Sequence, residues 1–284
     1  MILQKIKNLI CGKNIISHFC LHDTGKINLN SNIKKYSWAW KRRNIFNTEQ
    51  NIINPLLFHR ISTNIFPRKI LTWNIQELFL FSNEQKLNNV IKYLSDSNVD
   101  SIFLQEAFEP DSIRAIINNH NIESKFPYYL TGDMHSNFLI GENSGLLILS
   151  KFPISFQKFI PFKNTVFCDK FSTKGILYCK IGDINFAATH LQSENNKIAE
   201  EQLKLMVKFA PHDNNLIALG DFNINNANSI LNIEKNNYSI THRLGILDYI
   251  LPLSSDITVN INVDPINITN TSDHFPVIGK ILFH

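Results

Sequence analysis

Polar side chains that could bind a metal ion and phosphate oxygens recur where predicted strands end in this chain. Gly220 follows an apolar run and allows a sharp turn. Asp221 and Asn223 then leave the strand end two residues apart, so in extended geometry both side chains point the same way. A carboxylate and an amide converging there suit a magnesium ion and the phosphate oxygens bound to it. Taken alone, Asp-x-Asn after Gly also fits an ordinary loop.

Five further strand ends carry residues of this kind. They are Asn74, Gln105-Glu106, Thr189-His190, Asp248 and Asp273-His274. Each by itself is more often structural than catalytic. Because strand ends on one side of a sheet gather in one cleft, six of them in one domain predict a shared polar site.

Hydrophobic patterning from Lys69 onward predicts the elements that hold these residues. Helices are expected over 84–95, 111–119 and 195–210, the first with Ser82 or Asn83 as its cap. Strands with helices between some of them, and antiparallel pairs elsewhere, predict an α/β fold of stacked sheets flanked by helices. The expected strands cover 69–75, 100–106, 145–150, 154–161, 175–181, 184–190, 215–219, 247–251, 257–261 and 275–283.

Charge divides the chain into two parts. Residues 1–68 hold 11 Lys and Arg against two Asp and Glu, which leaves 17 against 22 for the remainder. The hydrophobic content of 44 % and charged content of 18 % are those of a globular protein with a core. We expect a basic N-terminal extension over 1–66, either a loosely packed tail or a targeting or lipid-binding arm, and a catalytic domain over 67–284.

Neither the targeting signals nor the cysteines determine the cellular compartment in which the protein works. The four cysteines form neither a disulfide framework nor a zinc motif, and Cys168 and Cys179 are expected to remain thiols. No apolar run reaches the roughly 20 residues of a membrane span. Lys13 and His18 interrupt the apolar start, so there is no clear signal peptide, and both a cytoplasmic and a secreted protein are compatible with the sequence.

Taken in order, the polar motifs resemble those of the endonuclease/exonuclease/phosphatase superfamily, which includes deoxyribonuclease I, abasic-site endonucleases, inositol polyphosphate 5-phosphatases and neutral sphingomyelinases. The resemblance covers residues 69–284 and implies a four-layer α/β/β/α sandwich of the deoxyribonuclease I-like type. It also implies a Mg²⁺-dependent hydrolase of phosphate esters. The motifs are Trp73-Asn74, Gln105-Glu106, Ser144-Gly145, Leu149-Ser150-Lys151, Thr189-His190-Leu191, Gly220-Asp221-Phe222-Asn223, Leu247-Asp248-Tyr249-Ile250 and Ser272-Asp273-His274.

Within the superfamily, two segments are most similar to neutral sphingomyelinases, which cleave sphingomyelin to ceramide and phosphocholine. The stretch from Asp169 to Lys174-Gly175 looks like their Asp-to-Lys segment, and Thr189-His190-Leu191-Gln192 resembles their His-Leu-Gln motif. The Trp-Cys-Asp-Arg signature of the 5-phosphatases does not occur in the sequence. The inositide phosphatase and the Mg²⁺-dependent endonuclease or exonuclease remain as alternatives.

For such a hydrolase we expect Glu106 to hold Mg²⁺, with Asn74 on the metal or on the scissile phosphate. His274 is the expected general base, because a histidine can be neutral and basic near pH 7, and Asp248 orients its ring. Asp221 and Asn223 position the water and the phosphate.

The remaining expected roles concern charge around the phosphate. Asp273 completes the environment of the metal or of His190. His190 stabilises the pentavalent transition state or protonates the leaving oxygen. Lys174, held by Asp169, adds positive charge near a phosphate oxygen.

The charge balance bears on the choice between a phospholipid and nucleic acid as the substrate. A nuclease needs a basic groove, which the acidic balance after residue 68 disfavours, and a binding module that has lost catalysis is a further alternative.

Residues 252–271 contain no aromatic residue that could enter a membrane. Peripheral membrane contact is therefore assigned to Leu78–Phe81, which could instead pack under the following helix, or to the basic N-terminus.

Overall fold

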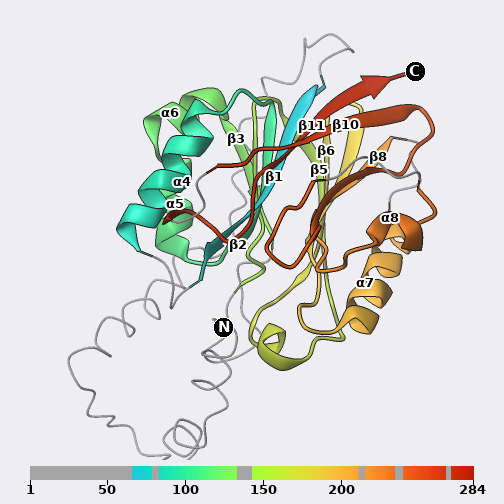
Figure 1. Cartoon of the computed structure of the whole chain (residues 1–284). Helices are drawn as coiled ribbons and strands as arrows, with labels where there is room; N and C mark the ends of the chain where they lie inside the picture. The colour runs from blue at the N-terminus through green and yellow to red at the C-terminus, as the bar shows by residue number, and fades with distance from the viewer. Residues whose placement is uncertain (1–65, 79–82, 133–142, 211–214, 234–238, 267–269) are drawn as a thin grey trace, which may run out of the picture. The chain divides into compact units, whose positions relative to one another are not determined.

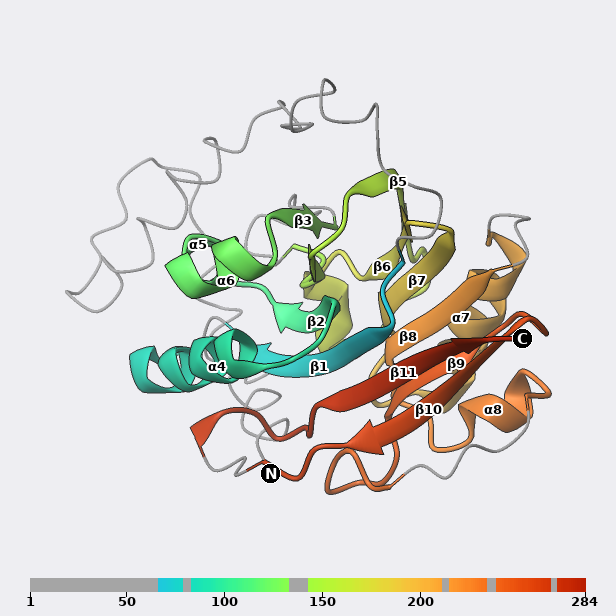
Figure 2. The same ribbon diagram turned by 90° about the horizontal axis from the view of Figure 1, so that it is seen from above.

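The computed structural model describes residues 66–78, 83–132, 143–210, 215–233, 239–266 and 270–284. They form two β-sheets with helices on the outside (Figures 1 and 2). The first sheet has the order β10-β11-β1-β2-β4-β3 and the second the order β5-β6-β7-β8-β9. The strands are β1 (Lys69–Glu77), β2 (Ser101–Ala107), β3 (Tyr128–Thr131), β4 (Leu147–Ser150), β5 (Ile154–Pro161), β6 (Gly175–Ile181), β7 (Ile184–His190), β8 (Leu216–Asp221), β9 (Asp248–Pro252), β10 (Ile257–Val263) and β11 (Val277–Phe283).

Three apolar clusters account for the layers. Successive side chains of a strand point to opposite faces of the sheet. Ile70 and Phe103 of the first sheet therefore pack with Phe186 and Ile217 of the second, in the core between the sheets. The outer face of the first sheet packs on α4 (Glu84–Asp96), α5 (Pro110–Ile117) and α6 (His120–Lys125). The outer face of the second sheet packs on α7 (Asn196–Lys208), next to the short α8 (Ala227–Ile230). The predicted α/β/β/α sandwich is confirmed.

Strand pairing brings the polar strand ends together. β1 and β2 run parallel with Asn74 opposite Gln105, and β7 and β8 run parallel with His190 opposite Asp221. β9 pairs antiparallel to β8 and places Asp248 opposite Asp221. The carboxyl ends of two parallel pairs, one in each sheet, therefore meet at one edge of the sandwich.

The helix expected over 111–119 is the clearest difference between prediction and structure. It ends at Ile117, and a second helix, α6, begins at His120. The side chain of Asn119 accepts the backbone N–H groups of Asn121 and Ile122, so this residue caps a new helix instead of continuing the first. The short elements β3 and α8 were also not predicted.

Several predictions fall outside the described residues. Residues 1–65 are among these, so the N-terminal extension and its boundary stay predictions. Of the stretch Leu78–Phe81 only Leu78 is described, and it is half-buried. Cys168 and Cys179 are both thiols. Within the described part, no helix is long and apolar enough to cross a membrane.

Candidate active site

Asp221 lies at the centre of the polar strand ends. The backbone of Gly220 before it has φ +132°, and a Cβ atom there would lie 2.0 Å from the Thr189 carbonyl oxygen. Only glycine fits this close approach of β8 to β7. The turn leaves the Asp221 carboxylate buried between β7 and β9, within reach of groups from both sheets.

Asn74 links the two sheets at this point. Its Nδ2 donates to Glu106 Oε1 at 2.8 Å and to Asp221 Oδ2 at 3.0 Å. Its Oδ1 accepts the backbone N–H of Gln76 at 3.0 Å. Glu106 and Gln76 both have positive φ, 55° and 52°, at the ends of β2 and β1. These costly backbone conformations lie directly beside the hydrogen bonds of Asn74, where β1 and β2 end.

Asp248 and His274 form a buried pair beside Asp221. Asp248 Oδ2 lies 2.8 Å from His274 Nδ1, so Nδ1 carries the proton and donates it. His274 Nε2 then faces Asp221 Oδ2 at 3.7 Å and Asp273 Oδ1 at 4.0 Å. Backbone contacts hold the ring in place, because Trp73 Nε1 donates to the His274 carbonyl at 2.9 Å. The imidazole is thus oriented with one nitrogen open toward the site.

Lys174 and His190 supply the second side of the site. Lys174 Nζ lies 2.8 Å from Asp169 Oδ1, 3.0 Å from the Leu191 carbonyl and 3.1 Å from His190 Nε2. An ammonium group has three N–H bonds, so these contacts engage all of them. His190 Nε2 also lies 3.5 Å from Asp221 Oδ2. Lys174 therefore brings its charge to the edge of the site while it remains anchored to Asp169.

Burial and mutual charge shift the pKa values of these groups. Burial raises the pKa of Glu106 to about 7 and that of Asp221 to about 6. Burial alone would lower the pKa of His274, but the carboxylates of Asp248, Asp221 and Asp273 outweigh it and raise the value to about 10. Burial, together with the charges of Lys174 and His274, holds the pKa of His190 well below its usual value. Such opposed shifts in one cluster are typical of active sites.

The oxygen atoms at this site fit a hard divalent cation. Glu106 Oε2 is buried and has no hydrogen-bond partner among the described residues. Glu106, His190 and Asp221 each offer a ligand atom within 4.8 Å of the others. Mg²⁺ prefers oxygen ligands and usually binds one or two carboxylates. His190 is the least suitable ligand of the three, because its Nε2 already faces the Lys174 ammonium. Glu106 and Asp221 are therefore placed to hold a divalent cation, whereas Asn74, which was expected on the metal or on the phosphate, donates its amide to both carboxylates.

The structure brings the predicted site residues together, with two further differences of detail. The Asp273 carboxylate lies beside His274 and His242 rather than against His190, while its other expected place, in the environment of the metal, stays a prediction. Asn223 donates its side-chain amide to the Leu191 carbonyl at 3.1 Å, and its backbone N–H to Asp221 Oδ1 at 3.0 Å. Asn223 thus supports the position of Asp221.

Two supporting residues were not predicted. Gln192 joins the end of β7 to Val166, since its Oε1 accepts the Val166 N–H at 2.8 Å and its Nε2 donates to the Val166 carbonyl at 3.2 Å. The His-Leu-Gln motif was a signal for it. His242 packs on His274 with ring centroids 4.5 Å apart, and its spacing of six residues from Asp248 gave no sign of this contact.

The buried Asp169–Lys174 pair leads to a prediction about stability. Replacing Lys174 by methionine should lower the free energy of unfolding by about 3–5 kcal/mol, because it leaves the Asp169 carboxylate buried without its cation. Urea unfolding followed by circular dichroism measures this. The double variant D169N/K174M should recover much of the loss.

The control for this experiment is the exposed pair Asp111–Arg114. Replacing Arg114 by methionine should cost less than about 1 kcal/mol. A K174M protein that unfolds at the same urea concentration as wild type would show that the buried pair contributes nothing net.

A family model described as Endonuclease/Exonuclease/phosphatase family matches residues 71–274. Among curated proteins, the chain is 28 % identical over 156 residues to a phospholipase C from Staphylococcus aureus. That match covers 45 % of this chain and 47 % of the relative, so the chain spans about half the length of the curated relatives it matches.

Solved structures with this fold include two bacterial proteins. A beta toxin from Staphylococcus aureus, crystallised as a double mutant with bound magnesium ions, has a TM-score of 0.62 at 20 % identity. The match covers 76 % of this chain and 99 % of that one. The sphingomyelinase C of Streptomyces griseocarneus has a TM-score of 0.58 at 17 % identity and covers 76 % of this chain and 99 % of its own. At these identities the likeness shows a shared fold.

Proposed function

This chain belongs to the Endonuclease/Exonuclease/phosphatase family, and from that premise we propose that it is a Mg²⁺-dependent phosphodiester hydrolase that cleaves sphingomyelin to ceramide and phosphocholine. The observation that carries the hydrolase proposal is the grouping around Asp221. The oriented imidazole of His274 lies on one side of Asp221. The Glu106 carboxylate lies on another side, and the amide of Asn74 donates to both Glu106 and Asp221.

The proposed reaction is attack of water on phosphorus. His274 Nε2 accepts a proton from the water, the new P–O bond forms, and the bond from phosphorus to the leaving oxygen breaks. The leaving oxygen takes a proton from solvent water and becomes the hydroxyl group of ceramide. Asp248 holds the imidazole with Nδ1 protonated, so that Nε2 offers its lone pair to the water. A divalent cation on Glu106 and Asp221 would polarise a phosphate oxygen and offset the carboxylate charge that keeps His274 protonated.

Lys174 and His190 are proposed to stabilise negative charge on the phosphate. The lowered pKa of His190 keeps its ring neutral near pH 7, and Nε2 accepts from the Lys174 ammonium, so His190 is proposed to hold that charge beside the phosphate and not to protonate the leaving oxygen. Lys174 acts through its charge at short range, because its N–H bonds are engaged by Asp169, Leu191 and His190.

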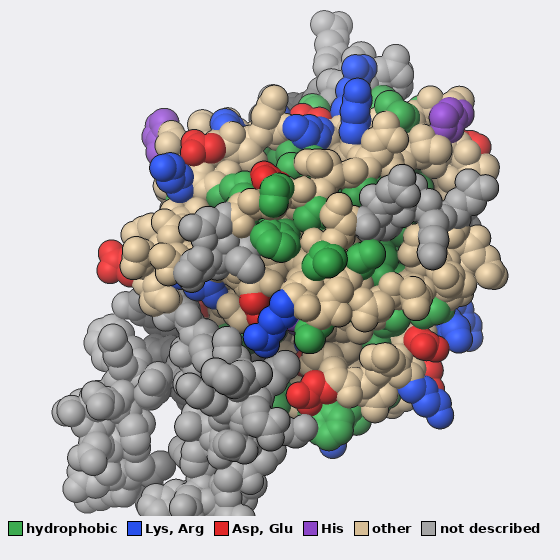
Figure 3. Space-filling model, in the orientation of Figure 1, with side chains coloured by type: hydrophobic (Ala, Val, Ile, Leu, Met, Phe, Trp, Pro, Cys, Tyr) green, Lys and Arg blue, Asp and Glu red, His purple; other side chains and the backbone are tan. Residues whose placement is uncertain are grey.

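Three observations support sphingomyelin as the substrate. The curated relative is named phospholipase C, and one structural neighbour is named sphingomyelinase C. The Asp169–Lys174 pair forms as the resemblance to neutral sphingomyelinases implies. On the face in Figure 3, Lys and Arg side chains are interspersed with Asp and Glu, and residues 69–284 hold 17 Lys and Arg against 22 Asp and Glu, a balance that disfavours nucleic acid.

The experiment that tests this proposal compares two substrates under the same conditions. Purified protein with Mg²⁺ should release phosphocholine from sphingomyelin micelles, and EDTA should abolish the release. Supercoiled plasmid should remain uncut in a parallel reaction. Nicked plasmid with intact lipid would place the protein with the nucleases, and no turnover of either substrate would count against the hydrolase itself.

Salt dependence separates the two substrate classes further. Turnover of a zwitterionic lipid in micelles should change little with ionic strength. Binding of nucleic acid through several phosphate contacts should instead weaken by about 10³-fold or more between 50 and 200 mM salt. A steep loss of lipid turnover over this range would contradict the proposed substrate.

A further inference from the structure

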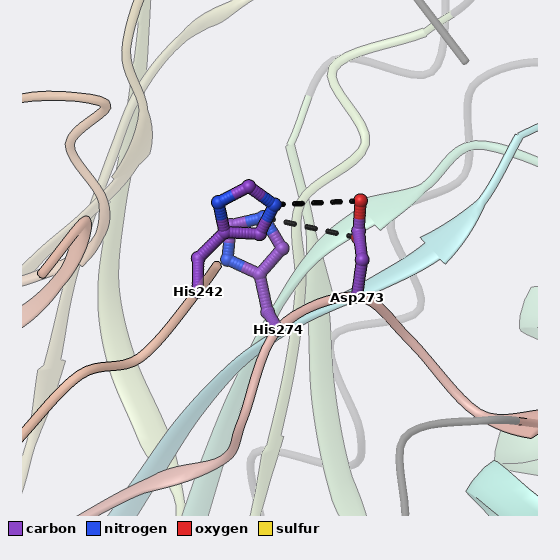
Figure 4. Close-up of side chains that lie close together, drawn as sticks. All are labelled: His242, Asp273 and His274. Atoms are coloured by element: carbon purple, nitrogen blue, oxygen red, sulfur yellow. Dashed lines mark ion pairs between the residues drawn. The ribbon is translucent and has the colours of Figure 1, made fainter. Parts of the chain in front are cut away.

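The turn that precedes β9 holds both members of the Asp248–His274 pair. Thr241 Oγ1 accepts the backbone N–H groups of Leu247 and Asp248, at 2.9 and 3.1 Å. The Thr241 carbonyl accepts the N–H of Phe275 at 2.8 Å, directly after His274. The next residue of the turn, His242, is buried and projects its ring onto the His274 ring (Figure 4).

The hydrogen bonds of His242 determine its tautomer. Its Nδ1 lies 3.1 Å from the backbone nitrogen of Leu244, whose N–H can only donate. Nδ1 is therefore the acceptor, and the single proton of the neutral ring lies on Nε2. A protonated Nε2 has no lone pair for a metal ion, so His242 is a donor and not a ligand, although it lies in a group with Asp273 and His274.

The Nε2 atom of His242 faces the Asp273 carboxylate and is the nearer of the two imidazole nitrogens to it. The distance from Nε2 to Asp273 Oδ2 is 3.6 Å, while the other oxygen, Oδ1, lies 4.0 Å from His274 Nε2 (Figure 4). The Asp273 carboxylate thus lies between two imidazoles. Its side chain is one-third exposed and can rotate unless a neighbour restrains it.

Asp273 has two possible effects on His274. Held toward His242, it leaves His274 Nε2 open to a water molecule. Rotated toward His274, it would form a charge-assisted hydrogen bond with Nε2 and occupy the position that the attacking water needs. The imidazole of His242 covers one face of the His274 ring, with an interplanar angle of 31°, and so limits the movement of that ring as well.

We propose that His242 is a positioning residue, which holds the Asp273 carboxylate away from His274 Nε2 through its own Nε2–H. This inference rests on the proposed function, because it gives His274 the role of general base. It assigns to His242 an effect on the chemical step rather than on substrate binding.

Three substitutions at His242 distinguish the effect of its Nε2–H donor from the effect of its ring. His242→Phe keeps a ring over His274 and removes the donor, His242→Gln keeps an amide N–H near the position of Nε2, and His242→Ala removes both. With Mg²⁺ and bis(p-nitrophenyl) phosphate as the probe, we expect the Phe and Ala variants to lose about 10- to 100-fold in kcat with KM nearly unchanged. The Gln variant should remain within about threefold of wild type, because it restores the donor.

The control is His120→Gln, since His120 is exposed at the start of α6. Thermal unfolding of each variant shows whether the fold is kept. A Phe variant with the kcat of wild type would overturn the proposal, and so would a Gln variant no more active than the Phe variant.

A second measurement is independent of any substrate. In protein labelled with ¹⁵N-histidine, His242 of the wild type should show an unprotonated Nδ1 and a protonated Nε2 at pH 7.5. A protonated Nδ1 would overturn the assignment of the donor. If wild type hydrolyses neither the diester nor sphingomyelin, the proposed function fails, and the NMR result still decides the orientation of His242.

Discussion

Replacing His274 by asparagine should lower kcat by about 10²- to 10⁴-fold, the range that a positioned general base contributes. Asparagine is the informative substitution because its amide N–H can replace the Nδ1–H that donates to Asp248. Alanine would instead leave Asp248, which is fully buried, without that donor. Turnover with Mg²⁺ on the true substrate, and thermal unfolding of the same samples, measure the two effects separately.

Asp248→Asn is the companion variant. Its amide can donate to His274 Nδ1, which favours the tautomer with the proton on Nε2 and so removes the base. We expect a loss of similar size to that of His274→Asn, and the double variant should be little worse than either single one, because the two residues act as a unit. A His274→Asn protein with near-wild-type kcat would show that another group accepts the proton.

Replacing Glu106 by glutamine should cost the second large share of activity. The side chain keeps nearly the same size and still offers an oxygen to the Asn74 amide, but it loses the negative charge that would hold Mg²⁺. Stabilisation by a cation of this kind amounts to several kcal/mol, which corresponds to a loss of more than about 10²-fold in rate. The activity of the variant should require much higher Mg²⁺ concentrations, or should not be restored at all.

The same substitution should change how stability depends on pH. The pKa of Glu106 is raised to about 7 by burial, from 4.5 for an ordinary glutamate. Between these two values the folded protein binds more protons than the unfolded chain, so the stability of the metal-free protein falls as the pH rises. Glutamine does not titrate, so Glu106→Gln should flatten this part of the curve.

Thermal unfolding in EDTA from pH 4.5 to 7.5 tests this prediction. Mg²⁺ should raise the unfolding temperature of the wild type at pH 7.5, where Glu106 is largely ionised, and much less that of the variant. His120→Gln again serves as the control. Equal shifts with Mg²⁺ in wild type and Glu106→Gln would mean that the cation binds elsewhere.

Most of the architecture could be predicted from local patterns. The strand that ends at Asp221 and the two strands that carry Asn74 and Glu106 follow from apolar runs bounded by polar residues, whereas the parallel pairing of those two strands does not. The junction between α5 and α6 did not follow, because Asn119 sits inside a helical pattern and its side chain caps the second helix. Competition between a side-chain cap and a continuing helix is decided by the local hydrogen bonds and not by periodicity.

The sequence by itself determined which polar residues stand at strand ends. Asn74, Glu106, His190, Asp221 and His274 could be grouped because the ends of neighbouring strands meet at one edge of a sheet, whatever the loops between them do. Only the tertiary structure decided which of them touch. The pairing of Asp273 with His242 rather than with His190, and the three contacts of Lys174, depend on side-chain directions across two sheets.

His242 shows the same limit most directly. It lies in a turn between elements, where no periodic pattern indicates the direction of a side chain, and its partners Asp273 and His274 are about thirty residues away in the sequence. Contacts between residues so far apart in the chain arise only when the sheets pack together. The sequence therefore predicted which polar groups come together at one edge, and the packing of two sheets decided how those groups are oriented.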